Sequence, residues 1–291
     1  MSVVPAPTAG TAGGAAPRSW SRARERVEAR RLSPSVVLSL AWLLVVLSWS
    51  LFPAVFTSQD PAAGVPADKL LPPSSEYWMG TDHLGRDLYT RIVHGAASSV
   101  TSALIAVLIG VFVGGLIGLL AGFLAGTVDV LLARFVDVLL AIPSFLLAVI
   151  VVSALGFDTT NAAIATGVSA VAVFARLMRS EVIKTKRAVF VESGYLQGGS
   201  RWQILLGHVL PNASRSVASL AVLQFGLAIL VIASLAFLGY GDPPPSSDWG
   251  LLVATGKDYL NWPWLVYAPA AAIIATVLSV NRISRWLRKT N

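Results

Sequence analysis

The sequence predicts an all-α integral membrane protein with six transmembrane helices. Hydrophobic residues make up 55% of the 291 residues and charged residues only 13%, with a mean hydropathy of +0.70. Soluble proteins carry roughly a quarter charged residues, so lipid must solvate much of this surface. Six charge-free intervals each reach the ~17 residues that a membrane-crossing helix needs. We expect spans near residues 35–56, 98–124, 134–155, 160–178, 217–238 and 264–282.

The segments between these spans alternate in charge. The N-terminal tail (1–34, expected to be disordered and basic), the loop 179–213 and the tail 283–291 are rich in Lys and Arg, whereas the segment 57–97 and the outer loop 239–263 are more acidic. The positive-inside rule then places both termini in the cytoplasm. The net charge of +7 therefore reflects membrane orientation, and nucleic-acid binding is not expected.

The predicted spans 98–124 and 134–155 carry packing signals. Glycine recurs at every fourth position on one face, at Gly110, Gly114, Gly118, Gly122 and Gly126, which favours close helix packing over a role in gating. Pro143 and Pro269 should bend the third and sixth spans. Arg134 and Asp137 favour an i,i+3 ion pair over a proton relay. Five aromatic residues predict a belt at the outer interface: Trp249, Tyr259, Trp262, Trp264 and Tyr267.

No residue pattern predicts chemistry within this chain. Cysteine is absent, and the three histidines (His83, His94 and His208) fall on opposite sides of the predicted membrane. No catalytic or nucleotide-binding motif has the required spacing. We therefore expect no enzyme activity, cofactor or metal in this chain.

The cytoplasmic segment between the fourth and fifth spans is longer than a simple connection needs. Val189–Leu196 is expected to form a short helix, Gly198 and Gly199 to break it, and Ser200 to cap a second helix that ends before Pro211. Such a helical hairpin suits docking to a protein partner. The alternative is a hairpin that lies on the lipid surface.

Three motifs resemble ABC-importer permeases. Glu192-Ser193-Gly194-x3-Gly198, followed by His208-Val-Leu210-Pro211, is similar to their EAA loop, with Ser193 and Gly194 in place of two alanines. Residues 79–87 contain Gly80, Thr81, Asp82, Gly85, Arg86 and Asp87, and resemble the Gly-Thr-Asp-x-x-Gly-Arg-Asp signature of the dipeptide, oligopeptide and nickel family, C-type subunit. Residues 237–250 resemble a third segment of the same subunits.

The resemblance implies a type I ABC importer permease in the bacterial inner membrane. Its partners would be a B-type permease, one fused or two separate ATP-binding subunits that hold ATP and magnesium, and an extracytoplasmic solute-binding protein. The ATPase-coupling residues would be Glu192, Ser193, Gly194, Gly198, Arg201, His208, Leu210 and Pro211. The motif at residues 80–87 would form either a polar plug held by internal hydrogen bonds or a contact with the binding protein. Di- or oligopeptides are the expected solutes, with nickel, glutathione or haem-like ligands as alternatives. Two alternatives belong to other functional classes: an ion-driven secondary transporter and a membrane scaffold that does not transport.

Overall fold

The computed structural model describes residues 33–290, in which every named element is a helix or a helical turn. Nearly all of the tail expected at 1–34 lies outside the described residues, since α2 begins at Pro34. The helices that follow in order are α2 (Pro34–Leu51), α3 (Pro53–Phe56), the turn η1 (Pro66–Asp68), α4 (Leu88–Ile109), the π-turn η2 (Gly110–Gly114), α5 (Gly115–Leu124), α6 (Gly126–Ala141), α7 (Ser144–Leu155), α8 (Thr159–Lys186), α9 (Val189–Leu196), α10 (Arg201–Ile204), the π-turn η3 (Leu205–Val209), α11 (Leu210–Phe237), α12 (Trp249–Gly256) and α13 (Trp264–Thr290).

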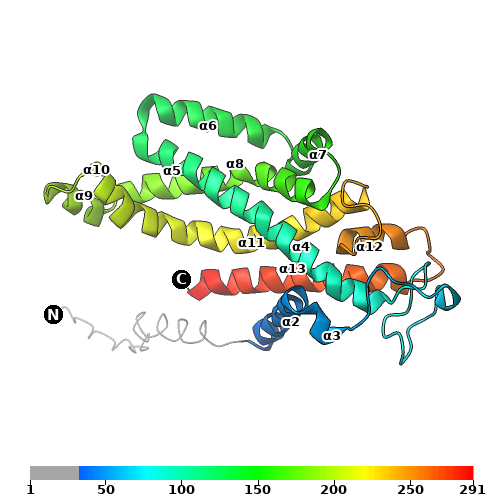
Figure 1. Cartoon of the computed structure of the whole chain (residues 1–291). Helices are drawn as coiled ribbons and strands as arrows, with labels where there is room; N and C mark the ends of the chain where they lie inside the picture. Colours follow the sequence, from blue (N-terminus) through cyan, green and yellow to red (C-terminus); the bar gives the residue numbers. More distant parts are fainter. Residues whose placement is uncertain (1–32, 291) are drawn as a thin grey trace, which may run out of the picture.

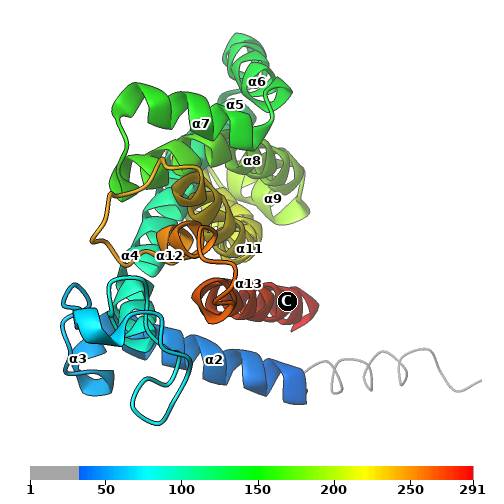
Figure 2. The same cartoon turned by 90° about the vertical axis from the view of Figure 1, so that its right-hand side faces the viewer.

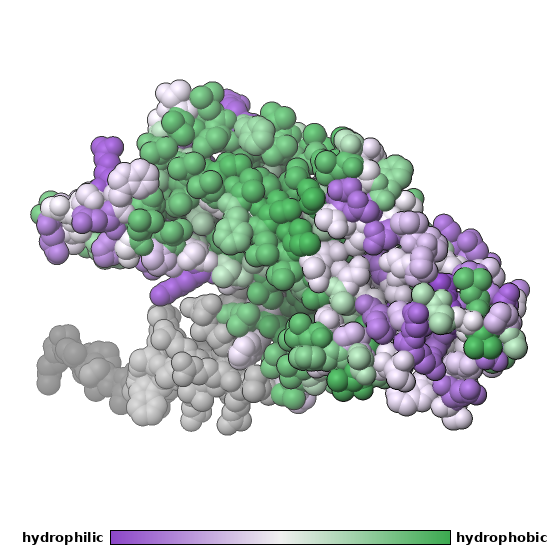
Figure 3. All heavy atoms as spheres, in the orientation of Figure 1, coloured by the Kyte–Doolittle hydropathy of each residue, from purple (hydrophilic) through white to green (hydrophobic). Residues whose placement is uncertain are grey.

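The long helices form a bundle with two distinct ends (Figure 1). One end, here called the α9 end, carries α9, α10 and the end of α13. The opposite α12 end carries α12 and residues 57–87. On the face that Figure 3 shows, hydrophobic side chains cover the middle of the bundle and hydrophilic ones gather at the two ends. This banding is the pattern that a bilayer imposes on a membrane-spanning bundle.

Five helical stretches of the described chain are long and apolar enough to cross a membrane. A sixth crossing exists only if α6 and α7 count as one span, because they meet at a 92° bend. The expected single helix 134–155 is therefore wrong, although Pro143 does mark the bend: it precedes the first residue of α7. Seen from the α12 end, α7 lies across the bundle against α8 (Figure 2).

Three other predicted boundaries are also wrong, each because a helix is longer than its charge-free interval. The second span begins at Leu88 rather than 98, since Asp87 caps the helix by accepting hydrogen bonds from the backbone N–H groups of Tyr89 and Thr90. Helix α8 continues beyond 178 to Lys186. The helix that starts at Arg201 runs through Pro211 to Phe237, so only residues 187–200 of the predicted 179–213 loop lie outside the long helices.

Helix α8 lies at the centre of the bundle and packs on the glycine face of η2 and α5. A Cβ at Gly114, Gly118 or Gly122 would meet the backbone of α8, and one at Gly110 would meet the ring of Phe174. Gly126 does not belong to this face: it has φ +61° at the start of α6 and nothing within 4 Å of a Cβ. The four-residue step therefore describes a packing face of four glycines, which brings the α5 and α8 backbones together.

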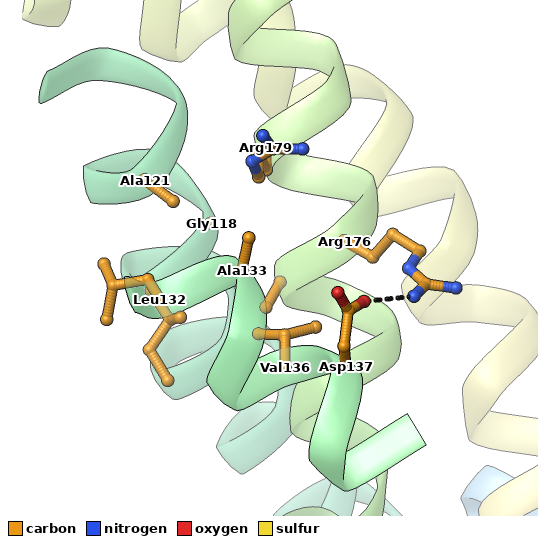
Figure 4. Close-up of a pocket in the computed structure, with 10 residues that line it drawn as sticks. Gly118, Ala121, Leu132, Ala133, Val136, Asp137, Arg176 and Arg179 are labelled. Atoms are coloured by element: carbon orange, nitrogen blue, oxygen red, sulfur yellow. Dashed lines mark hydrogen bonds and ion pairs between the residues drawn. The ribbon is translucent and has the colours of Figure 1, made fainter. Parts of the chain in front are cut away.

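Ion pairs join α6 to α8. Asp137 pairs with Arg176 at 2.7 Å and not with Arg134, so the expected i,i+3 pair is wrong. One helical turn further along α8, Arg179 donates to both carboxylate oxygens of Asp129 through Nε and Nη2. Figure 4 shows Asp137 and Arg176 side by side at the rim of a small pocket between α5, α6 and α8. The two pairs fix α6 along α8 on the side opposite to α13 (Figure 1).

Candidate functional site

The helical hairpin of α9 and α10 projects from the α9 end of the bundle (Figure 1). Helix α9 has the expected bounds, and it follows α8 after only two residues, Arg187 and Ala188. The hairpin is held by apolar side chains on its inner side: Val191, Ile204, Leu205 and Val209 are all buried in the main hydrophobic core. It is therefore a packed extension of α8 and α11 and not a loose loop.

The turn of the hairpin is shaped by Gly198, which ends α9. Its φ of +85° lies in the left-handed region, and its N–H donates to the carbonyl of Tyr195. A Cβ here would meet nothing within 4 Å, so the backbone conformation and not crowding favours glycine. At Gly199, by contrast, a Cβ would lie 2.9 Å from the carbonyl oxygen of Gly194.

Ser200 starts the second helix with a complete capping box, as its type and position predict. Its hydroxyl accepts from the N–H of Gln203, and the Gln203 side chain accepts from the N–H of Ser200. The prediction that this helix ends before Pro211 is wrong, because the π-turn η3 carries the chain into α11. Pro211 lies in the first turn of α11, directly after the π-turn. Proline has no N–H to donate, and this position does not need one, so Pro211 destabilises the helix little.

The outer side of the hairpin exposes large apolar side chains. Leu196 is 85% exposed and Val189 78%, and Trp202 and Leu206 are each 61% exposed. Glu192 and Arg201 lie exposed among them. A cluster of exposed apolar side chains on a projection is typical of an interaction surface.

The remaining residues of the predicted coupling set have distinct places. Ser193 donates its hydroxyl to the carbonyl of Val189, and Gly194 faces Ile204 with room for a Cβ, whose nearest contact would be an ordinary 3.7 Å. The alanine that the resemblance leads one to expect at 194 would therefore fit. The ring of His208 lies beside Phe190, with 6.3 Å between the ring centroids, and Leu210 packs against the main core.

The motif at residues 80–87 folds into a bonded plug at the α12 end. Gly80 and Gly85 both have φ +77°, which allows the tight turns on either side of Asp82. Thr81 is fully buried and accepts from the N–H of Leu71. Asp82 accepts from the N–H groups of Leu84 and Arg86. The plug ends at Asp87, whose carboxylate caps α4.

Arg91 joins this plug to the segment before α12, a role that the sequence did not reveal. Its guanidinium donates to Asp82 at 2.9 Å and to the carbonyl oxygen of Ser246 at 2.6 Å. Arg86 donates to the same carboxylate at 2.7 Å, and all three charged side chains are at least 96% buried. Burial opposes ionisation of Asp82, but the N–H groups of Arg86 and Leu84 and the Arg86 charge outweigh it and hold its pKa below the usual value.

Asp248 is a second buried carboxylate at the α12 end, and its role was not predicted from the sequence either. It caps α12 by accepting from the N–H groups of Gly250 and Leu251, and it accepts from the Ser99 hydroxyl at 3.1 Å. Its burial raises its pKa although these hydrogen bonds oppose the rise. The adjacent Trp249 is fully buried and donates to the carbonyl of Ile92, so it belongs to the core and not to the predicted aromatic belt.

Among residues 33–290, no group of three His, Cys, Asp or Glu side chains is placed to hold a metal ion. The arrangement as a whole offers an apolar bundle, a rigid projection at one end and a bonded plug at the other.

Comparison with known proteins identifies the relatives of this bundle. Residues 114–290 match the model of the family described as "Binding-protein-dependent transport system inner membrane component". The dipeptide transport system permease protein DppC of Alkalihalophilus pseudofirmus is 37% identical over 86% of this chain and 84% of its own length. The glutathione transport system permease protein GsiD of Shigella flexneri is 42% identical over 74% and 72%.

The fold is shared with solved transporters. The MetNI methionine ABC transporter in an inward-facing conformation superposes with a TM-score of 0.56 over 69% of this chain and 96% of the matched chain, at 16% identity. An amino acid ABC transporter crystallised with histidines gives a TM-score of 0.53 at 14% identity, over 68% and 92%. This chain thus has the ABC importer permease fold, and by its sequence it belongs to the binding-protein-dependent transport system inner membrane component family.

Proposed function

We propose that this chain is the C-type membrane subunit of an ATP-driven importer of peptides. It would line half of the solute path beside a B-type permease, and an extracytoplasmic binding protein would deliver the solute. ATP and magnesium would bind in partner ATPase subunits, fused or separate. The α9 end would face the cytoplasm, because the Lys- and Arg-rich segment 179–213 lies there, and the basic tails expected at both termini would be on the same side.

The observation that carries this proposal is the α9–α10 hairpin. Its inner side is packed into the bundle core and its outer side exposes Leu196, Val189 and Trp202. A lipid-surface hairpin would place an apolar face along the membrane plane, whereas this projection extends from the end of the bundle (Figure 1). An ATPase subunit that covers these side chains could move α8 through the short 187–188 connection.

Peptides are the solute class that the relatives favour. The relatives include a dipeptide permease, a probable D,D-dipeptide permease and a glutathione permease, at 34–42% identity. All three solutes contain amide bonds between amino acids. This favours a peptide over the nickel or haem-like ligands that the resemblance left open.

The test is reconstitution of the full complex with variants of Gly198. At φ +85° with open space around the missing Cβ, Gly198→Val should strain the turn by about 1–2 kcal/mol, whereas Gly198→Asn should be accommodated, since asparagine tolerates the left-handed region. We expect Gly198→Val to lower both solute-stimulated ATP hydrolysis and dipeptide uptake, and Gly198→Asn to retain most of each.

Binding-protein docking serves as the control, because it depends on the other end of the bundle. If Gly198→Val complexes transport at the level of the unmodified complex, the hairpin does not couple ATP hydrolysis to transport. If no tested peptide stimulates ATP hydrolysis by the unmodified complex, the assignment of the solute class is wrong. That outcome would not contradict the coupling role of the hairpin.

A further inference from the structure

Two cavities lie along one seam between α8 and α11. The first, of about 290 Å³, is at mid-depth and also touches α4 and the start of α7. The second, of about 670 Å³, lies between the same two helices nearer the α9 end. Their lining residues on α8 follow one helical face, with steps of three or four: Thr166, Ser169, Val173, Leu177, Glu181 and Lys184.

The matching face of α11 is equally regular: Ser216, Leu220, Gln224, Leu227 and Val231. Gln224 lies thirteen residues before the last residue of α11 and Ser169 ten residues after the first of α8. At 1.5 Å per residue these positions are about 20 Å and 15 Å from the α12 end of their helices, close to the middle of a ~30 Å hydrocarbon core. The seam therefore runs from mid-membrane to the α9 end.

The chemistry of the seam changes along its length. At mid-depth its polar groups are uncharged: the hydroxyls of Ser144, Thr166 and Ser169 and the amide of Gln224. Ser144 reaches the cavity because the bend at Pro143 starts α7 there. Nearer the α9 end the lining includes charges of both signs, from Glu181, Lys184 and Arg215.

Neither lipid nor a tightly packed neighbour suits this lining. The hydroxyls of Thr166 and Ser169 donate to carbonyl oxygens of α8 and so tolerate a dry environment. Hydrocarbon offers no partner to the amide of Gln224, and the charges of Arg215 and Glu181 would be more costly still. The neighbouring surface of α11 is different: Leu230, next to Val231 but off the seam, is 48% exposed and lies among mostly apolar side chains of α11, α12 and α13. A graded polar stripe fits contact with water and with a polar solute.

We propose that the α8–α11 seam is this chain's lining of the solute path. This inference rests on the proposed import function and extends it to the residues that meet the solute. The uncharged cavity would exchange hydrogen bonds with peptide amides, with Gln224 as both donor and acceptor. The mixed charges nearer the α9 end would receive the ammonium and carboxylate ends of a zwitterionic peptide as it leaves the membrane.

The test uses the absence of cysteine from this chain. Single variants Gln224→Cys, Val231→Cys and Leu230→Cys are assembled into the full complex in proteoliposomes and treated with a water-soluble cationic methanethiosulfonate. Leu230 is the matched control, because it is adjacent to Val231 in sequence and depth. Only an ionised thiolate in contact with water reacts quickly, so Gln224→Cys and Val231→Cys should react at least about tenfold faster than Leu230→Cys.

The isolated chain predicts the opposite order, since Leu230 is more exposed than Val231. Equal rates, faster reaction at Leu230→Cys, or no reaction at Gln224→Cys would overturn the assignment of the seam. Uptake of labelled dialanine provides a second readout: Gln224→Leu should raise KM more than Gln224→Asn does. If the unmodified complex takes up no dipeptide, the proposed solute fails, but the labelling contrast still tests whether the seam is the water-filled path.

Discussion

Replacing Gly118 by alanine should destabilise the bundle, although alanine is the better helix former. A Cβ at Gly118 would lie 2.8 Å from the Cβ of Met178 and 2.9 Å from the backbone nitrogen of Arg179, and closer still to the carbonyl oxygen of Ala175. Ordinary contacts begin at 3.4 Å, so α5 and α8 would have to separate by at least 0.6 Å. Two of these obstacles are backbone atoms that no rotamer change can move.

Gly115 provides a matched control on the same helix. A Cβ there meets only the terminal methyl of Met178 at 3.7 Å, an ordinary contact. Both substitutions gain up to about 1 kcal/mol in helix propensity. Only Gly118→Ala adds overpacking, which costs about 1–3 kcal/mol. The two variants should therefore differ by about 1–3 kcal/mol, with Gly115→Ala the more stable.

The measurement is equilibrium unfolding of the purified chain in mixed micelles, followed by circular dichroism as the fraction of dodecyl sulfate rises. We expect the Gly118→Ala transition at lower dodecyl sulfate than that of the unmodified chain and the Gly115→Ala transition at the same or a higher fraction. Coincident transitions for the two variants would refute the reasoning, because they would mean that α5 and α8 are not in backbone contact at Gly118.

Three further predictions use the same unfolding assay. Asp248→Asn should match or exceed the stability of the unmodified chain at pH 7, because asparagine still caps α12 and no charge is buried beside Ser99, whereas Asp248→Leu should lose about 1–3 kcal/mol. The pKa of Asp82 is lowered in the folded chain, so the ionised carboxylate contributes fully to the free energy of unfolding above the ordinary pKa of 3.8, and this contribution is lost as the pH falls through the lower folded pKa. Asp82→Asn should remove this loss of stability in acid. Lys186→Met should cost about 1–3 kcal/mol, because the ammonium donates to the carbonyl of Phe123 at 2.8 Å and caps α5, and a variant as stable as the unmodified chain would rule out that cap.

The order of the long apolar helices could be predicted from the sequence because the charges that separate them are expensive in lipid. Their number could not be settled in the same way, because the third predicted span is the bent pair α6 and α7. The same criterion misplaced helix ends, since it detects where charge stops and not where hydrogen bonding stops. Helix α8 carries Arg176 and Arg179 within its regular helix, where Asp137 and Asp129 on α6 neutralise them. Ion pairs between helices depend on the tertiary structure, which residue spacing along one helix cannot predict.

The hairpin was the most predictable part of the candidate site, because its signals are local. A glycine at φ +85° and a serine capping box act within four residues, so the turn at Gly198 and the cap at Ser200 could be placed from sequence. The plug was only partly predictable. Arg91 and Asp248 join this end of the bundle through contacts to residues about 150 positions away in the sequence. From the sequence alone, Arg91 marks only the edge of a span and Asp248 is an ordinary loop residue.

The described contacts also indicate how a movement of the hairpin would reach the solute. Gly114, Gly118 and Gly122 bring η2 and α5 against the backbone of α8, so we expect these helices to move as one body. Helices α8 and α11 also pack on each other, but two cavities interrupt their contact. The hairpin bridges these two helices through Val191 and Ile204. We therefore expect a partner that tilts the hairpin to change the α8–α11 separation, which is the change that opens or closes the seam.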